Sequence, residues 1–148
     1  MNPPPTYIRL HPNAPLPEIE RFRWFRAAVV LDAEYSDDWQ MAVSRWLVDS
    51  GCLYMMAWGP KCTTWDDSVD YAQILKHLPG EAPVNEWVMT TWHDEETLED
   101  VFWQMRFSAM DELGRIEHSL IVHIGVADRA EEFQALYVRA EDLAEREA

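Results

Sequence analysis

Basic residues are scarce in this chain: 12 lysines and arginines stand against 27 aspartates and glutamates, which gives a formal net charge of −15. A field of that sign repels a phosphate backbone, and the sequence contains no local basic patch, so general nucleic-acid binding is not expected. The charge fits a basic protein partner better. The alternative is that the acidity serves only solubility.

Long apolar runs are also missing. None approaches the roughly 20 residues that a membrane span needs, and the N-terminal Met-Asn-Pro-Pro-Pro-Thr-Tyr lacks the basic and apolar regions of a secretory signal. We therefore expect no membrane association and a cytoplasmic location. The length of 148 residues suits a single domain over 1–148, in which residues 1–24 form an extended segment that wraps the core.

Cysteine is represented only by Cys52 and Cys62. A strand over residues 53–58, at about 3.3 Å per residue, would hold them about 20 Å apart, whereas a disulfide needs Cα atoms within about 7 Å. We therefore expect two free thiols, as in a reducing compartment. This spacing matches no zinc site, and neither HxxxH nor HExxH occurs, so no metal is expected.

Glycine-rich phosphate-binding motifs are absent as well, since the chain contains neither GxGxxG nor GxxxxGK[ST]. Carboxylates occupy the expected helix starts, where each stabilises the helix dipole by about 0.3–1 kcal/mol. A phosphate group would need those backbone N–H groups to be free. A dinucleotide or P-loop cofactor is therefore not expected, and the sequence indicates no other cofactor.

What the sequence does contain is a repeated unit, in which a short apolar run is followed by a capped amphipathic helix. The apolar runs cover residues 27–31, 53–58, 87–92 and 119–124, and the expected caps are Ser36, Thr64, Thr97 or Asp94, and Asp128. This alternation predicts a three-layer α/β fold with a mostly parallel sheet of four or five strands, flavodoxin-like or Rossmann-like. A fifth strand over 6–10 is expected at an edge, because prolines surround it.

Polar side chains crowd the carboxyl ends of these strands, where open parallel sheets bind ligands. Three of them are candidate catalytic residues: Glu34, Cys62 and His93. Cys62 near a helix start could have a lowered thiol pKa, and His93 beside a carboxylate run could act as a base. The alternatives are an inert cysteine and a surface histidine. His123, inside an apolar run, fits a core histidine.

Four further residues are candidate ligand-binding groups: Trp58, Trp65, Asp66 and Trp92. Two tryptophans on either side of the Gly59-Pro60 turn could form a platform for a ligand, or they could cover the core. A metal site built from Glu34, His93, Asp94 and one more ligand is conceivable, but no ligand motif supports it.

The lateral order of the strands decides whether these groups meet. In a common order for small doubly wound sheets, the strands over 27–31 and 87–92 are neighbours and their helices leave on opposite faces. Glu34 and His93 would then face one another across a crevice, with Cys62 and Trp58 as one wall. We predict that this crevice is the functional pocket.

Two motifs resemble a family of short acidic bacterial proteins of unknown function. They are LYMMAWGPKCTTWDDSVD over 53–70, and MTTWH over 89–93 with the following segment 98–103. The resemblance runs from about Phe25 to Asp128. It implies a bacterial origin and a single small domain, and it supplies no activity and no catalytic residues.

The sequence favours a binding module of a regulatory or immunity type, which recognises a protein partner or a small ligand. Its support is the charge and the eight tryptophans, since aromatic residues are common in binding hot spots. The alternative is a hydrolase or transferase that uses Cys62, His93 and Glu34. A glutamate acting on a nucleotide is a third hypothesis, against which the missing phosphate loop counts.

Overall fold

The computed structural model describes residues 3–81 and 83–147. Its centre is a five-stranded sheet in which all neighbouring strands are parallel, in the order β1-β5-β2-β3-β4. The strands are β1 (Thr6–Leu10), β2 (Phe25–Leu31), β3 (Cys52–Trp58), β4 (Met89–Trp92) and β5 (His118–Ile124). β1 lies at an edge, as its flanking prolines predict.

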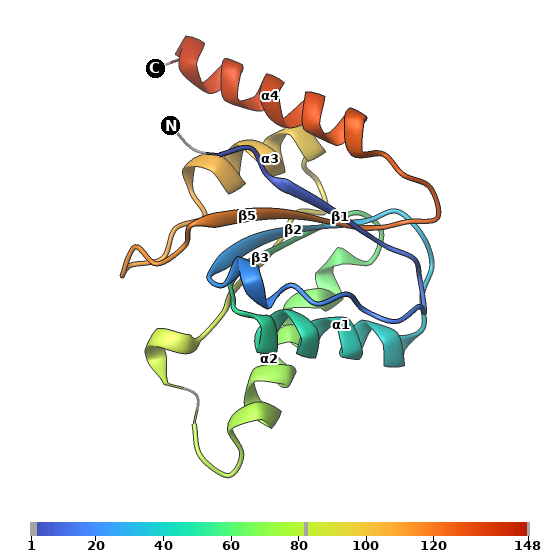
Figure 1. The fold of residues 1–148 in the computed structure, drawn as a ribbon, viewed down its shortest axis with the longest axis vertical. Coiled ribbons are helices and arrows are strands. Elements are labelled where there is room, and N and C mark those ends of the chain that lie inside the picture. The colour runs from blue at the N-terminus through green and yellow to red at the C-terminus, as the bar shows by residue number, and fades with distance from the viewer. Residues whose placement is uncertain (1–2, 82, 148) are drawn as a thin grey trace.

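Four helices cover the two faces of this sheet (Figure 1). They are α1 (Asp37–Ser50), α2 (Trp65–His77), α3 (Leu98–Phe107) and α4 (Ala130–Glu147). α1 and α2 pack on one face, and α3 and α4 pack on the other. The predicted three-layer α/β fold is therefore confirmed.

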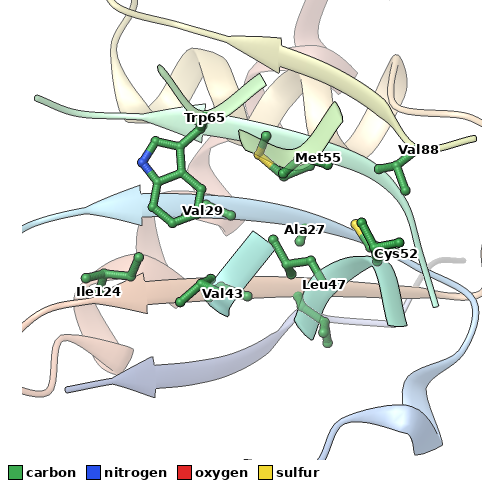
Figure 2. Close-up of a cluster of buried hydrophobic side chains, with 14 of the residues drawn as sticks. Ala27, Val29, Val43, Leu47, Cys52, Met55, Trp65, Val88 and Ile124 are labelled. Carbon is green, nitrogen blue, oxygen red and sulfur yellow. The ribbon is translucent and has the colours of Figure 1, made fainter. Parts of the chain in front are cut away.

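The central strands are apolar on both faces because both faces are covered. Along β2, Ala27 and Val29 point toward α1 and α2, whereas Ala28 and Val30 point toward α3 and α4. Figure 2 shows part of the first cluster, where Trp65 of α2 packs near Val29. Alternate side chains of one strand thus build two separate hydrophobic cores.

Two of the expected helix caps are formed as predicted. The Ser36 hydroxyl accepts a hydrogen bond from the Trp39 N–H at 3.2 Å, and Thr97 forms a capping box with Asp100. Gly51 ends α1 with φ of 106°, a conformation that favours glycine. The polar residues before α1 and α3 therefore fix where these helices begin.

Two local expectations were wrong. Thr64 precedes α2 but does not cap it, because its hydroxyl donates instead to the Lys61 carbonyl at 2.9 Å within a short 3-10 turn over 62–64. The strand expected over 87–92 begins only at Met89. Trp87 follows another 3-10 turn, Val84–Glu86, and lies outside the sheet.

The segment between β1 and β2 is held against α1. The indole N–H of Trp39 donates to the Ala14 carbonyl at 2.9 Å, and that of Trp46 donates to the Pro17 carbonyl at 2.6 Å. Ile19 is buried in the same core. The predicted segment 1–24 is thus partly a strand and partly a connector along α1, while Met1 and Asn2 lie outside the described residues.

The strand order differs from the one that the predicted crevice required. β3 pairs with β2 on one side and with β4 on the other, so it separates these two strands. The chain moves outward from β2 through β3 to β4 and then returns to β5 on the other side of β2. α1 leaves β2 on one face and α4 leaves β5 on the other, which places the switch point between β2 and β5.

Candidate functional site

Glu34 and His93 do not face one another across a crevice, which corrects the sequence-based pocket. Glu34 is exposed in the loop after β2, and His93 is buried directly after β4. β3 lies between these two strands. The assumed neighbourhood of β2 and β4 was wrong because chain neighbours pair here, and apolar runs do not encode lateral order.

Cys62 and His93 do lie close together, at the ends of the adjacent strands β3 and β4. Both are buried, and the thiol of Cys62 lies near the backbone of His93. Burial raises the pKa of the Cys62 thiol, and the carboxylate of Asp94 adds to the effect. The thiol is therefore protonated near neutrality, which does not suit a nucleophile.

The imidazole of His93 is occupied on both sides. Its Nε2 lies 2.8 Å from the Thr91 hydroxyl, and its Nδ1 lies 2.9 Å from a carboxylate oxygen of Glu96. The same oxygen of Glu96 accepts from the Gln104 side chain. This cluster fastens the start of the β4–α3 loop onto α3.

The candidate ligand-binding residues have different surroundings. Trp65 is fully buried and donates its indole N–H to the Tyr35 hydroxyl at 2.8 Å, so its ring offers no surface to a ligand. Trp58 is half-buried and donates to the Glu96 carbonyl at 2.7 Å. Asp66 is half-buried at the start of α2, and Trp92 is exposed on the edge strand. Trp65 therefore belongs to the core.

The switch point between β2 and β5 carries a hydrogen-bonded cluster that the sequence did not predict. His123 on β5 lies with Nδ1 2.6 Å from the Tyr7 hydroxyl of β1 and with Nε2 2.9 Å from a carboxylate oxygen of Asp32. Arg129 donates to that same oxygen at 3.0 Å through its guanidinium, and its backbone N–H donates to the Tyr7 hydroxyl at 3.0 Å. The four residues form a closed ring of hydrogen bonds.

One proton arrangement satisfies every group in this ring. Tyr7 accepts from Arg129 and donates to Nδ1 of a neutral His123, whose Nε2–H donates to the Asp32 carboxylate. Gly125 leaves room for the imidazole, because a Cβ at that position would clash with Nε2 of His123. The expected core histidine is thus confirmed, since His123 is fully buried and both its nitrogens have partners.

The charges of the ring favour an ionised Asp32. Burial is the largest single influence and opposes ionisation, but hydrogen bonds from His123 and Arg129 together outweigh it and lower the pKa of Asp32. Arg129 also pairs with Glu132 at 2.6 Å. Because its donors and acceptors are paired with one another, the ring fastens β1 and α4 to the centre of the sheet.

A hollow lies at the opposite edge of the sheet, where the strands begin. It is a groove of about 720 Å³ between the starts of β3 and β4 and the loop from α3 to β5. We call this hollow the amino-edge groove. Its apolar lining comprises Leu53, Tyr54, Trp87, Met89, Met110 and Leu113. Four of these side chains are exposed, and a contiguous exposed apolar surface of this kind is typical of a binding site.

The polar rim of the groove is mainly acidic. Asp111 and Glu112 line it, together with Asn85 and Arg115. The Arg115 guanidinium is bound by Asp111, with nitrogen-to-oxygen distances of 2.8 and 3.0 Å. Because Asp111 and Arg115 compensate one another, Glu112 is left as the uncompensated charge of the rim. The groove therefore favours a ligand whose apolar part is next to a basic group.

Sequence reasoning missed this groove because it forms where the starts of two strands meet loop residues such as Trp87, Met110 and Leu113. Met110 and Leu113 are large apolar side chains in a short segment with no helical or strand period, and this was the available signal. The pairing of Tyr7 with His123 left no such signal, because it depends on which strands are neighbours.

Two kinds of feature are absent from the described residues. In the part of the chain that the structure describes, no group of three or more histidine, cysteine, aspartate and glutamate side chains is arranged to hold a metal ion. No helix in residues 3–81 and 83–147 is long and apolar enough to cross a membrane. Both cysteines are free, as predicted from the strand between them.

Comparison with known families gives one match. A family described as "Domain of unknown function (DUF7684)" matches residues 5–140, and the chain belongs to this family. The expected membership in an uncharacterised family is confirmed. Comparison with curated proteins and with solved structures gave no match.

Proposed function

We propose that this DUF7684 protein is a binding module whose partner occupies the amino-edge groove. The observation that carries the proposal is the groove itself, with Trp87, Met89, Met110 and Leu113 exposed around about 720 Å³ of space. Burying large exposed apolar and aromatic side chains against a partner is favourable, because it removes apolar surface from water.

A non-catalytic role is supported by the state of the candidate catalytic groups. The Cys62 thiol is buried with a raised pKa, and both ring nitrogens of the nearby His93 have other partners. Glu34 is on the far side of β3. The remaining support for the hydrolase or transferase alternative is the contact between His93 and Glu96. Both nitrogens of the His93 ring already have partners, because Nε2 contacts Thr91.

The charge and the thiols supply two further parts of the proposal. A net charge of −15 favours a basic protein over an acidic one as the partner. Two unpaired cysteines fit a reducing compartment, and we place the protein in the cytoplasm on that basis.

Titration with Nile red, a neutral dye that becomes fluorescent in apolar surroundings, tests whether the groove accepts an apolar ligand. We expect saturable emission with the native chain and a loss of about tenfold in affinity when Met110 and Leu113 are both changed to serine, since two apolar contacts are lost. Val126→Ser is the matched control: Val126 is 68% exposed and Leu113 is 64% exposed. Equal binding by the double variant and the native chain would contradict the proposal.

A further inference from the structure

The two edge strands of the sheet differ in how they are protected from pairing with a further strand. β1 carries Arg9 and is flanked by Pro5 and Pro12, and charges and prolines of this kind block the pairing of an edge with another strand. β4 reads Met-Thr-Thr-Trp and contains neither a charge nor a proline. The outer side of β4 is therefore a short but unprotected sheet edge.

The alternation of the backbone identifies the groups at this edge. The His93 N–H donates to the Ala57 carbonyl of β3 at 3.0 Å, and Thr91 is in register with Met56 of β3. In a parallel ladder, alternate residues bond to the same neighbour, so the N–H and C=O groups of Thr90 and Trp92 point away from β3. Within the described residues no further strand lies beside them.

The two faces of β4 differ in chemistry. On one face Met89 lines the amino-edge groove and is 54% exposed. On the other face α2 packs on the strand, and the carboxylate of Asp70 in α2 lies near the Thr90 side chain. The carboxylates of Asp66 and Asp67 are near enough to Asp70 to raise its pKa, after the larger effect of burial. An added strand would meet apolar side chains on one face and carboxylates on the other.

The charge around β4 identifies the kind of occupant. Glu86 precedes the strand, and Asp94, Glu95 and Glu96 follow it within four residues. The edge of a second copy would bring the same carboxylates, and each chain carries a net charge of −15, so self-pairing would be repulsive. A segment with basic side chains would instead be attracted.

We propose that β4 receives an extended basic segment of a partner protein as a sixth strand of the sheet. Its alternate side chains are apolar, toward the amino-edge groove, and basic, toward Asp66, Asp67 and Asp70. The four residues of β4 provide about 13 Å of edge, which corresponds to four or five residues of the partner. This inference rests on the proposed function, and it adds the chemistry and the conformation of the partner.

Calorimetric titration with the peptide Ac-Lys-Val-Lys-Val-Lys-Val-Lys-NH₂ tests this inference on the full chain. The control peptide has the same sequence and charge, with N-methyl groups on the valine amides, and a second control carries them on the lysine amides. Only alternate amides of an added strand donate to β4. One of the two methylated peptides should therefore bind about tenfold more weakly than the unmethylated peptide, because it loses two or more hydrogen bonds. Hydrogen exchange at the Thr90 and Trp92 amides should slow in the complex with the unmethylated peptide.

Two charge variants locate the site. Glu112→Lys in the groove rim should weaken binding of the unmethylated peptide about threefold or more, because it places a like charge beside the peptide. Glu34→Lys, which makes the same change in net charge at the opposite edge, should have a smaller effect. A larger effect of Glu34→Lys would overturn the inference.

The remaining outcomes separate this inference from the proposed function. If all three peptides bind equally, or if exchange at Thr90 and Trp92 does not change, strand addition is wrong. If no peptide binds while Nile red does, strand addition is wrong and the groove still binds an apolar ligand. A dimer of the native chain in sedimentation, dissociated by Thr90→Pro, would assign the edge to a second copy and overturn the inference.

Discussion

The hydroxyl of Tyr7 lies 2.6 Å from Nδ1 of the fully buried His123, and this contact joins the edge strand β1 to the central sheet. Tyr7→Phe keeps the ring but leaves Nδ1 and the Arg129 backbone N–H without this partner. We expect a loss of about 1–3 kcal/mol in the free energy of unfolding, the cost of buried polar groups without partners. Urea denaturation measures it, with Tyr71→Phe at an exposed tyrosine as the control, and equal stabilities of the two variants would contradict the role of the ring.

Asp32 should stabilise the protein in a pH-dependent way. Its pKa in the folded chain is lowered, so its contribution is fully present above the ordinary value of 3.8 and is lost as the pH falls through the folded value. Asp32→Ala should therefore cost about 1 kcal/mol at pH 7, from the lost His123 partner and the half-exposed Arg129 pair. The difference from the native chain should shrink in acid.

The control for Asp32 is Glu34→Ala, a change to an exposed carboxylate in the same loop. It should shift the free energy of unfolding by less than about 0.5 kcal/mol. An Asp32→Ala penalty that stays constant between neutral pH and acid would contradict the lowered pKa.

Asp70 should make stability depend on pH in the direction opposite to that of Asp32. Burial, and then the charges of Asp66 and Asp67, raise its pKa in the folded chain. Near that pKa the folded state binds more protons than the unfolded state, so stability falls as the pH rises through this range. Asp70→Asn removes the charge and should raise the melting temperature at pH 7, whereas Asp67→Asn, at an exposed position in the first turn of α2, should not. A lower melting temperature for Asp70→Asn would contradict this account.

The two thiols should be unreactive in the folded protein. Burial raises the pKa of Cys52 to about 12 and also raises that of Cys62, so neither forms appreciable thiolate near neutrality. We expect slow labelling by Ellman's reagent in buffer and rapid labelling of both thiols in denaturant. Rapid labelling of Cys62 in the native protein would support the hydrolase or transferase alternative instead.

The local parts of the fold could be predicted from the sequence because their causes are local. Short apolar runs indicated the strands, and Ser36, Thr97 and Gly51 marked helix ends through hydrogen bonds within a few residues. The cap expected at Thr64 was wrong, because its hydroxyl donates to the Lys61 carbonyl in the 3-10 turn before α2. A cap can be read from sequence only when no competing turn is present.

The candidate site could not be predicted in the same way, because it depends on the order of the strands. The positions of Glu34 and His93 were inferred correctly as strand ends, but β3 separates them. The ring of Tyr7, Asp32, His123 and Arg129 forms because β5 lies between β1 and β2. Neither the apolar runs nor the caps determine that arrangement.

The central claim is that the amino-edge groove binds the partner. The most direct measurement is a nitrogen–proton correlation spectrum of the labelled protein during titration with the alternating lysine–valine peptide. We predict shifts of the Trp87 indole resonance, assigned with Trp87→Phe, and of the amides of Met89 and Leu113, while the amides of Glu34 and Val126 stay in place. Shifts confined to the carboxyl ends of the strands, with Trp87 and Leu113 unchanged, would contradict the claim.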